Sequence, residues 1–247
     1  MISKQELVEL KKKTGLNLYY LEKEYLQYIF LHAISTYGDS IVFKGGTCLR
    51  ICYGLERASE DLDFSFTGSV SALKKIIETS LQSFTRLGIE YTNVIQKEFE
   101  GNIRFEIQFK GPLYNTANNS VNTLKVDFNK NKVYCKKAKV IKELFSDVPS
   151  FVLVVLDEKE ILAEKIRAIA HRKQARDLYD LWILLGKGVE IDKTLIKKKL
   201  KEELVDLKKI SLLSKESYEQ DLRNLLTFTP GYDQVVKDIR DFLKSLM

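Results

Sequence analysis

The chain has 247 residues, of which 45% are hydrophobic and 30% are charged. This length and composition allow one large domain or two small ones with a buried core, and they exclude a disordered tail protein. Twelve glycines and three prolines are too few for a collagen-like or linker-dominated chain. No stretch approaches the roughly 20 consecutive apolar residues of a membrane-spanning helix, so we expect a soluble protein with no membrane partner.

The charge balance is basic, with 40 Lys and Arg residues against 34 Asp and Glu residues and a formal net charge of +6. This surplus indicates either a polyanionic partner such as nucleic acid or simply solvated lysine-rich helices, and charge alone does not decide between them. The three cysteines form no CxxC pair, and the first residues include lysines rather than an apolar leader. Both features favour the reducing cytoplasm.

The first part of the chain mixes helical and strand patterns. Ser3 and Glu6 form a capping box, which predicts a helix that ends at Gly15. Apolar spacing predicts further helices over 19–37, 47–53 and 70–87. Runs rich in β-branched and aromatic residues, several of them alternating, predict strands over 41–43, 62–66, 89–99, 102–109, 123–129 and 151–156.

From residue 158 onward the pattern is helical to the end of the chain, with helices predicted over 158–171, 175–185, 193–207, 214–226 and 232–246. The change of period predicts an α+β protein. We expect a mixed sheet with flanking helices in a domain over 1–156, and an all-helical C-terminal domain over 157–247. Trp182 shares a helix face with leucines and is expected to anchor the core.

Three aspartates carry the strongest chemical signal. Asp61 and Asp63 are two residues apart in a predicted strand, so both carboxylates project from the face opposite to Leu62. Asp127 lies between two apolar residues of another strand and points away from the core, towards the first two if the strands are neighbours. Carboxylate oxygens select Mg²⁺ or Mn²⁺, although an acidic pair on a solvated strand face is a common alternative.

A glycine turn precedes these aspartates. Gly45 and Gly46 follow a predicted strand and open a short helix, so their backbone N–H groups are free to bind phosphate oxygens. The hydroxyl of Thr47 adds a further donor. A strand, a Gly-Gly-Thr turn, a short helix and an Asp-x-Asp strand together indicate a nucleotide-phosphate site beside a metal site.

A second block lies on the C-terminal helices. Lys165 sits in an apolar helix and is suited to pairing with a triphosphate as a point charge. Arg176, Asp177 and Asp180 share one face of the next helix. An ordinary ion pair between Arg176 and Asp180 is the alternative to a functional role. The lysines from 197 to 201, with Lys208 and Lys209, form either a solvated face or an RNA-binding surface.

These blocks resemble the nucleotidyltransferase superfamily of the DNA polymerase β type. Within it, the chain is most similar to the AbiEii/AbiGii-type toxin nucleotidyltransferases. The matching segments are FKGGTCLR (43–50), SEDLDF (59–64), LKVDF (124–128) and EKIRAIAHRKQARDLYDL (164–181).

The resemblance implies two-metal nucleotidyl transfer from a nucleoside triphosphate. It implies that Asp61 and Asp63 hold the metals, that Asp127 binds one of them, and that Lys165 binds nucleotide phosphate. It also implies that either Asp177 or Asp180 contributes to the site. Gly45, Gly46, Thr47 and Arg176 complete the predicted nucleotide-binding set.

The resemblance further implies a toxin of a bacterial toxin-antitoxin system, often active in phage defence, that blocks translation by modifying the 3′ end of tRNA. The antitoxin would be encoded nearby. Two alternatives stay open: transfer to a protein or small molecule, and a catalytically silent RNA-binding or antitoxin-binding module.

Overall fold

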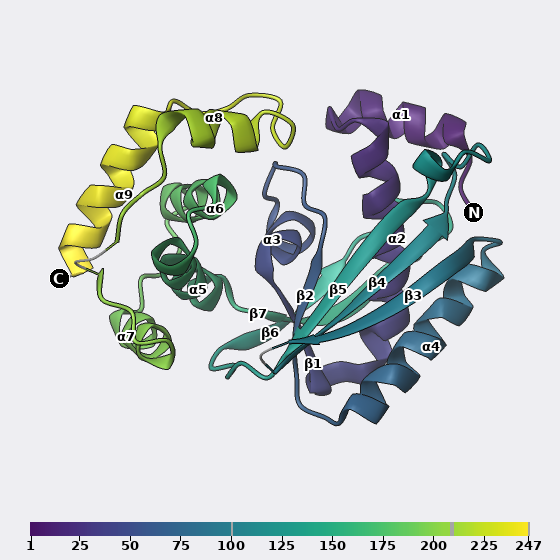
Figure 1. The fold of residues 1–247 in the computed structure, drawn as a ribbon, viewed down its shortest axis with the longest axis horizontal. Helices are drawn as coiled ribbons and strands as arrows, with labels where there is room; N and C mark the ends of the chain where they lie inside the picture. The colour runs from purple at the N-terminus through teal and green to yellow at the C-terminus, as the bar shows by residue number, and fades with distance from the viewer. Residues whose placement is uncertain (100, 208–209, 247) are drawn as a thin grey trace. The chain divides into compact units, whose positions relative to one another are not determined.

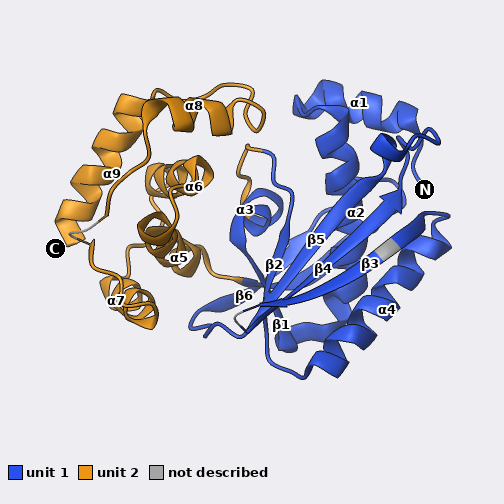
Figure 2. Cartoon of the chain, in the orientation of Figure 1, with its two compact units in different colours: residues 1–52, 58–155 blue, residues 53–57, 156–247 orange. Residues whose placement is uncertain are grey.

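The structure of the chain is a computed structural model that describes residues 1–99, 101–207 and 210–246. The chain divides into two compact units (Figure 2). Unit 1 consists of residues 1–52 and 58–155, and unit 2 consists of residues 53–57 and 156–247. The chain therefore leaves unit 1 after Cys52, returns to it at Ala58, and leaves it again after Val155.

Unit 1 is built around one mixed sheet (Figure 1). Within the described residues its strand order is β3-β4-β5-β2-β1-β7-β6. The central strands β2 and β5 are parallel, as are β1 and β7, whereas the other pairs with assigned registers are antiparallel. The strands are β1 (Ile41–Lys44), β2 (Leu62–Phe66), β3 (Glu90–Phe99), β4 (Asn102–Lys110), β5 (Asn122–Asn129), β6 (Lys136–Ile141) and β7 (Phe151–Leu156).

The helices of unit 1 are α1 (Lys4–Thr14), α2 (Leu18–Ile34), α3 (Gly45–Tyr53) and α4 (Val70–Arg86), with short 3₁₀ turns η1 (Ser35–Ser40) and η2 (Asn118–Ser120). Aromatic contacts join α2 and α4 to one face of the sheet. Phe30 of α2 packs against Phe64, and the ring of Phe84 of α4 stacks on Phe109 at 4.3 Å. This face holds the core of the unit, because apolar area buried there is removed from water.

The other face of the sheet is polar. Along β4 every second residue, from Ile103 to Phe109, is buried, and the residues between them are partly exposed. The same alternation places Val126 and Phe128 of β5 in the core and turns Asp127 the other way. Strand periodicity therefore turns the sheet's polar side chains away from the α2 and α4 side.

The described residues of unit 2 are mainly helical, and the unit also includes the last residue of β7 and the segment 53–57. Its helices are α5 (Glu158–His171), α6 (Ala175–Gly186), α7 (Lys193–Glu202), α8 (Lys215–Leu222) and α9 (Tyr232–Leu246). Helix α6 contacts α5, α8 and α9, and α5 also contacts α7. Among the described residues, none of the helices combines the length and apolar character needed to cross a membrane.

The predicted α+β class, with a mixed sheet, flanking helices and a helical C-terminal part, is confirmed. The predicted capping box is present, since Ser3 accepts from the Glu6 N–H and Glu6 accepts from the Ser3 N–H. Strand β6 was missed. It lies at the edge of the sheet, where half of its side chains stay exposed and the lysine-rich sequence lacks an apolar face.

Three helix predictions need correction. Helix α7 ends at Glu202 instead of 207, because Leu204 adopts a left-handed conformation with φ of 54°. Helix α8 ends at Leu222 instead of 226, and the predicted helix over 19–37 stops at Ile34 before η1. In the hairpin turn predicted at 100–102, Glu100 lies outside the described residues. Trp182 is only partly buried, and its indole N–H donates to Asp238 at 2.9 Å.

Candidate active site

A row of charged residues crosses the sheet from β1 to β3. The strand registers place Lys44 opposite Asp63, Asp63 opposite Asp127, Asp127 opposite Arg104, and Arg104 opposite Lys97. Directly opposed residues point to the same face of a sheet. The structure thus brings Asp127 next to Asp63, as the strand pattern predicted, and sets the two carboxylates between a lysine and an arginine.

Arg104 neutralises Asp127 directly. Its Nε lies 2.7 Å from Oδ1 of Asp127 and its Nη2 lies 2.9 Å from Oδ2, so both carboxylate oxygens accept from one guanidinium. The contact raises the pKa of Arg104 above its usual value, chiefly through this hydrogen bond. A cation therefore already sits on the carboxylate that was predicted to bind metal, which makes Arg104 part of the site.

Asp61 lies just outside the strand register that pairs Asp63 with Asp127. It directly precedes β2, whereas Asp63 lies within the strand and faces Asp127. In the described part of the chain, no group of three or more Asp, Glu, His or Cys side chains is close enough to hold one metal ion together. The geometry thus pairs Asp63 with Asp127, and the three-carboxylate metal set stays a prediction.

Gly45 is required by its contact with Asp63. Its backbone has a φ of 78°, in the left-handed region that side chains disfavour. A Cβ atom built on Gly45 would collide with Oδ2 of Asp63. The glycine therefore lets the backbone at the start of α3 approach the Asp63 carboxylate closely, and this fixes the predicted phosphate-binding turn beside the predicted metal ligand.

Thr47 connects the same turn to the segment before β2. Its side chain is buried, its hydroxyl donates to the carbonyl of Asp61, and it lies 2.8 Å from the hydroxyl of Ser59. Those contacts position Asp61 and leave the hydroxyl engaged within the protein. The structure therefore gives Thr47 a positioning role, and its predicted contact with phosphate stays untested.

Helix α2 supports the site with a buried polar stripe. The amide of Gln27 donates to the carbonyls of Ser59 and Glu60, at 3.0 and 2.9 Å. The ammonium of Lys23 donates to the carbonyl of Thr123 on β5 at 2.6 Å. These contacts tie one helix to the segment that carries Asp61 and to the strand that carries Asp127. Buried polar groups of this kind must be paired, so they specify one geometry.

In unit 2, Lys165 joins both acidic residues of the predicted helical block. Its Nζ lies 2.7 Å from Oδ1 of Asp177 and 2.6 Å from Oδ2 of Asp180. The lysine is 6% exposed, and both carboxylates are fully buried. One buried cation thus lies between two buried anions, which explains why these three residues occur together.

Asp180 has a second cation. Nε and Nη2 of Arg57 donate to its two oxygens at 2.6 and 2.7 Å. Burial alone would raise the pKa of Asp180, but the charges of Arg57 and Lys165 lower it below the usual value. The predicted ion pair between Arg176 and Asp180 does not form: Nε of Arg176 donates to Gln174 at 2.9 Å, and Arg57 takes its place.

Asp177 is bound from the surface side by Arg172, whose Nε donates to Oδ2 at 2.8 Å. Burial opposes ionisation of this carboxyl too, yet Lys165 and Arg172 hold its pKa well below the usual range. The two acids therefore differ. Asp180 is enclosed by two buried cations, whereas the network of Asp177 continues to an exposed arginine.

The lysine run of α7 is not a uniform solvated face. Lys199 is fully buried, and its Nζ lies 2.7 Å from Glu160 and 3.1 Å from Glu164 of α5. Lys197, Lys198 and Lys201 are exposed. Lys208 and Lys209 lie outside the described residues. The middle lysine of the run therefore holds α7 on α5, and the exposed ones are available to solvent.

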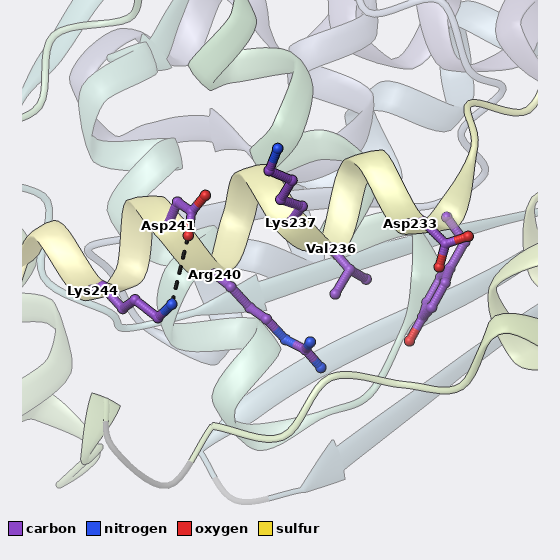
Figure 3. Close-up of a pocket in the computed structure, with 7 residues that line it drawn as sticks. Asp233, Val236, Lys237, Arg240, Asp241 and Lys244 are labelled. Atoms are coloured by element: carbon purple, nitrogen blue, oxygen red, sulfur yellow. Dashed lines mark ion pairs between the residues drawn. The ribbon is translucent and has the colours of Figure 1, made fainter.

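A shallow cavity of about 290 Å³ runs along α9 (Figure 3). Its lining includes the cations Lys237, Arg240 and Lys244, and Lys244 pairs with Asp241 at 3.6 Å. All of its lining residues belong to this one helix or its first turn. The cavity is a charged groove with cations of the kind that contact phosphates, and it contains none of the predicted site residues.

Sequence reasoning missed three cations: Arg104 and Lys23 near the aspartates of unit 1, and Arg57 in the charged cluster of unit 2. Each is far in sequence from its partner, by 23 residues for Arg104 and by 123 for Arg57. Knowledge of the register of β4 on β5 would have revealed Arg104, because this register places Arg104 directly opposite Asp127. Nothing in the local pattern marks Arg57, which lies in a charged loop.

The mixed sheet with flanking helices and a helical C-terminal part is a fold shared with solved structures. MenT4, a nucleotidyltransferase toxin from Mycobacterium tuberculosis H37Rv, shares the fold with a TM-score of 0.72 at 18% identity, over 100% of this chain and 90% of that one. JHP933 from Helicobacter pylori aligns with a TM-score of 0.65 at 21% identity, over 94% and 93%. No curated protein matches the chain by sequence.

The sequence itself identifies the family. The model of the AbiEii nucleotidyl transferase toxins of type IV toxin-antitoxin systems matches residues 29–245. The chain belongs to this family and is a nucleotidyltransferase. The match includes the segments that hold Gly45, Asp63, Asp127, Lys165 and Asp180.

Proposed function

We propose that the protein is a metal-dependent toxin that transfers nucleotides from a nucleoside triphosphate to the 3′ end of tRNA and thereby blocks translation. It acts in the cytoplasm, in a phage-defence type of system, and a cognate antitoxin encoded nearby restrains it. The observation that carries the proposal is the pairing of Asp63 with Asp127 beside the Gly45 turn. Family membership supports the nucleotidyl transfer and the antitoxin.

The donor nucleotide binds through its phosphates. Backbone N–H groups of Gly45 and Gly46 at the start of α3 are suited to phosphate oxygens, with Thr47 behind them. Lys165 and Arg176 of unit 2 supply positive charge for nucleotide phosphate. Asp177 and Asp180 support this role, because their two carboxylates fix the position of the Lys165 ammonium.

The acidic residues suit a hard divalent cation. Asp63 and Asp127 present oxygen donors side by side on neighbouring strands, and Asp61 adds a third carboxylate one step along the chain. Oxygen ligands of this kind are those that Mg²⁺ and Mn²⁺ prefer. Metal bound there would stabilise negative charge on the transferred phosphoryl group and on the attacking and leaving oxygens.

The chain's own residues orient the reaction. Asp127 is placed to accept the proton of the acceptor hydroxyl, and Arg104 holds that carboxylate in one orientation through two hydrogen bonds. Gly45 keeps the donor turn against Asp63. Phosphoryl transfer depends mainly on positioning and on charge stabilisation, which is what these contacts provide.

Incubation with each labelled nucleoside triphosphate, Mg²⁺ and total tRNA tests the proposal. We expect label at the tRNA 3′ end, lost by at least a hundredfold in Asp63→Asn and Asp127→Asn with the fold retained. Asp39→Asn, an exposed aspartate of η1, is the matched control and should keep activity. Label only in protein or a small molecule would overturn the tRNA acceptor, and absence of both transfer and nucleotide binding would overturn the enzyme.

A further inference from the structure

A cavity of about 340 Å³ opens in unit 1 beside Asp61. It is lined from α2, from the segment before β2, from the polar face of β4 and β5, and from Ile95 of β3. The size falls within the range of small-molecule pockets. Neither the phosphate-binding turn at Gly45 nor the helical block of unit 2 contributes to it, so the predicted donor site leaves this space unexplained.

The cavity lies on the opposite side of β2 from the donor turn. The strand order β4-β5-β2-β1 places Gly45, which follows β1, on one side of Asp61 and Asp63. The lining strands β4 and β5 lie on the other side. In an in-line displacement the attacking oxygen approaches the phosphorus from the side opposite to the leaving oxygen. A group that reaches the carboxylates from this cavity is therefore placed as the second reactant.

The cavity is also within reach of the reacting groups. Side chains that alternate along a strand are about 7 Å apart. Lys125 and Thr123, which line the cavity, precede Asp127 on β5 by two and four residues. Asp61 itself belongs to the lining. A single nucleoside seated here spans that interval and presents its ribose hydroxyls at the catalytic end.

The chemistry of the lining suits a nucleoside. Tyr19 is 47% exposed, and its ring has the Lys23 ammonium 5.0 Å from its centroid. Gln108 lies opposite Thr123 across the β4 and β5 ladder, and Glu106 lies opposite Lys125. An aromatic ring offers stacking to a base, and amide, hydroxyl and carboxylate groups offer hydrogen bonds to its edge. Lys125 adds attraction for the adjoining phosphate.

We infer that this cavity binds the unpaired terminal nucleoside of an RNA acceptor. The base packs on Tyr19, its edge meets Gln108 and Glu106, and the phosphate on its 5′ side meets Lys125. The inference rests on the proposed nucleotidyl transfer and adds where the acceptor binds and which residues select it. A protein acceptor fits less well, because an extended peptide would leave the aromatic and amide pair without a planar partner.

Fluorescence anisotropy can measure the binding of a short single-stranded oligoribonucleotide without triphosphate. This measurement tests the site independently of turnover. Base stacking on an aromatic side chain is worth about 1–3 kcal/mol, so Tyr19→Ala should weaken RNA binding by about tenfold. Tyr19→Phe keeps the ring and should stay within about threefold. Lys125→Ala should weaken binding and reduce its salt dependence. Triphosphate binding should be unchanged in all three.

Matched controls lie on the helix-covered side of the unit. Tyr91 is an exposed tyrosine of β3 paired with the buried Phe109, and Lys75 is an exposed lysine of α4. Tyr91→Ala and Lys75→Ala should bind RNA as the wild type does. Equal RNA binding by Tyr19→Ala and Tyr91→Ala, with both folded, would overturn the inference.

A photoreactive base at the 3′ terminus of the RNA gives a second readout. Cross-links should map to the peptides that carry Tyr19 or the strands β4 and β5. Cross-links confined to unit 2, or competition by protein acceptors and not by RNA, would also overturn the inference. If the protein transfers no nucleotide and yet binds RNA through Tyr19, the proposed function fails while the binding site stands.

Discussion

Arg104 donates two hydrogen bonds to Asp127, at 2.7 and 2.9 Å, from the directly opposite position on the neighbouring strand. The arrangement has two effects on metal binding. It fixes the orientation of the carboxylate, and it places a positive charge where a divalent cation needs the same oxygens. Arg104 and metal therefore compete for Asp127.

The competition predicts the behaviour of Arg104→Gln. A partly exposed ion pair is worth about 1 kcal/mol, so its loss should tighten Mn²⁺ binding by about fivefold in calorimetry. Lys110→Gln removes a similarly exposed cation of the same strand β4, paired with Glu90 of β3, and should leave Mn²⁺ affinity unchanged. Weaker Mn²⁺ binding by Arg104→Gln would mean that the arginine assists metal binding instead.

A comparison of Gly45→Ala with Gly88→Ala should separate the effect of backbone strain on stability from the effect of the Asp63 contact on activity. The substitution costs about 1 kcal/mol for the positive φ, and its Cβ also displaces the Asp63 carboxylate. Nucleotide transfer should fall by at least a hundredfold. Gly88→Ala is the matched control, because Gly88 has a φ of 71° and open space around it. It should show the stability cost in urea unfolding with full activity, and equal activity of the two variants would contradict the role given to Gly45.

The two acids of α6 should differ in their effect on stability. Asp180→Asn removes the carboxylate charge that faces the two buried cations Arg57 and Lys165, which should lower the free energy of unfolding by about 3–5 kcal/mol. Asp177→Asn keeps the contact of Lys165 with Asp180 and weakens a contact of the exposed Arg172, so about 1–2 kcal/mol is expected. Urea unfolding of both variants measures the difference. The reverse order would show that Lys165 depends mainly on Asp177.

The same acids should make stability depend on pH. The folded-state pKa values of Asp177 and Asp180 are lowered from their usual values. Groups with lowered pKa values stabilise the fold above the unfolded value of about 3.9 and lose that contribution as the pH falls through the folded value. The free energy of unfolding should therefore decline below about pH 5, less steeply in Asp177→Asn. Asp241→Asn, on the exposed face of α9, should keep the wild-type slope.

Much of the fold followed from local periodicity. The alternation around Asp63 and around Asp127 predicted which side of each strand faces the core: Leu62, Phe64, Val126 and Phe128 are buried, and the register sets Asp127 beside Asp63. The register that makes these two aspartates neighbours depends on the order of strands in the sheet, which no local pattern contains. Edge strand β6 was missed because an edge needs little apolar area.

Two polar residues of α2 show a second limit of sequence reasoning, which is that burial of a polar side chain cannot be read from its type. Lys23 and Gln27 look like solvent-facing positions, since most charged and polar side chains are exposed. In the structure both are buried, because carbonyl groups of β5 and of the segment before β2 need donors there. Such positions are set by distant backbone groups. The same reason hid Arg57, whose carboxylate partner is 123 residues away.

The five residues of unit 2 inserted between α3 and β2 have a consequence for synthesis of the chain. Arg57 leaves the ribosome long before Asp180, 123 residues later, is made. Until then the pair between Arg57 and Asp180 cannot form, so the segment 53–57 reaches its final packing only after α6 has been translated. A short piece of chain made early thus belongs to a unit that is completed late, and the packing of unit 2 cannot follow the order of synthesis.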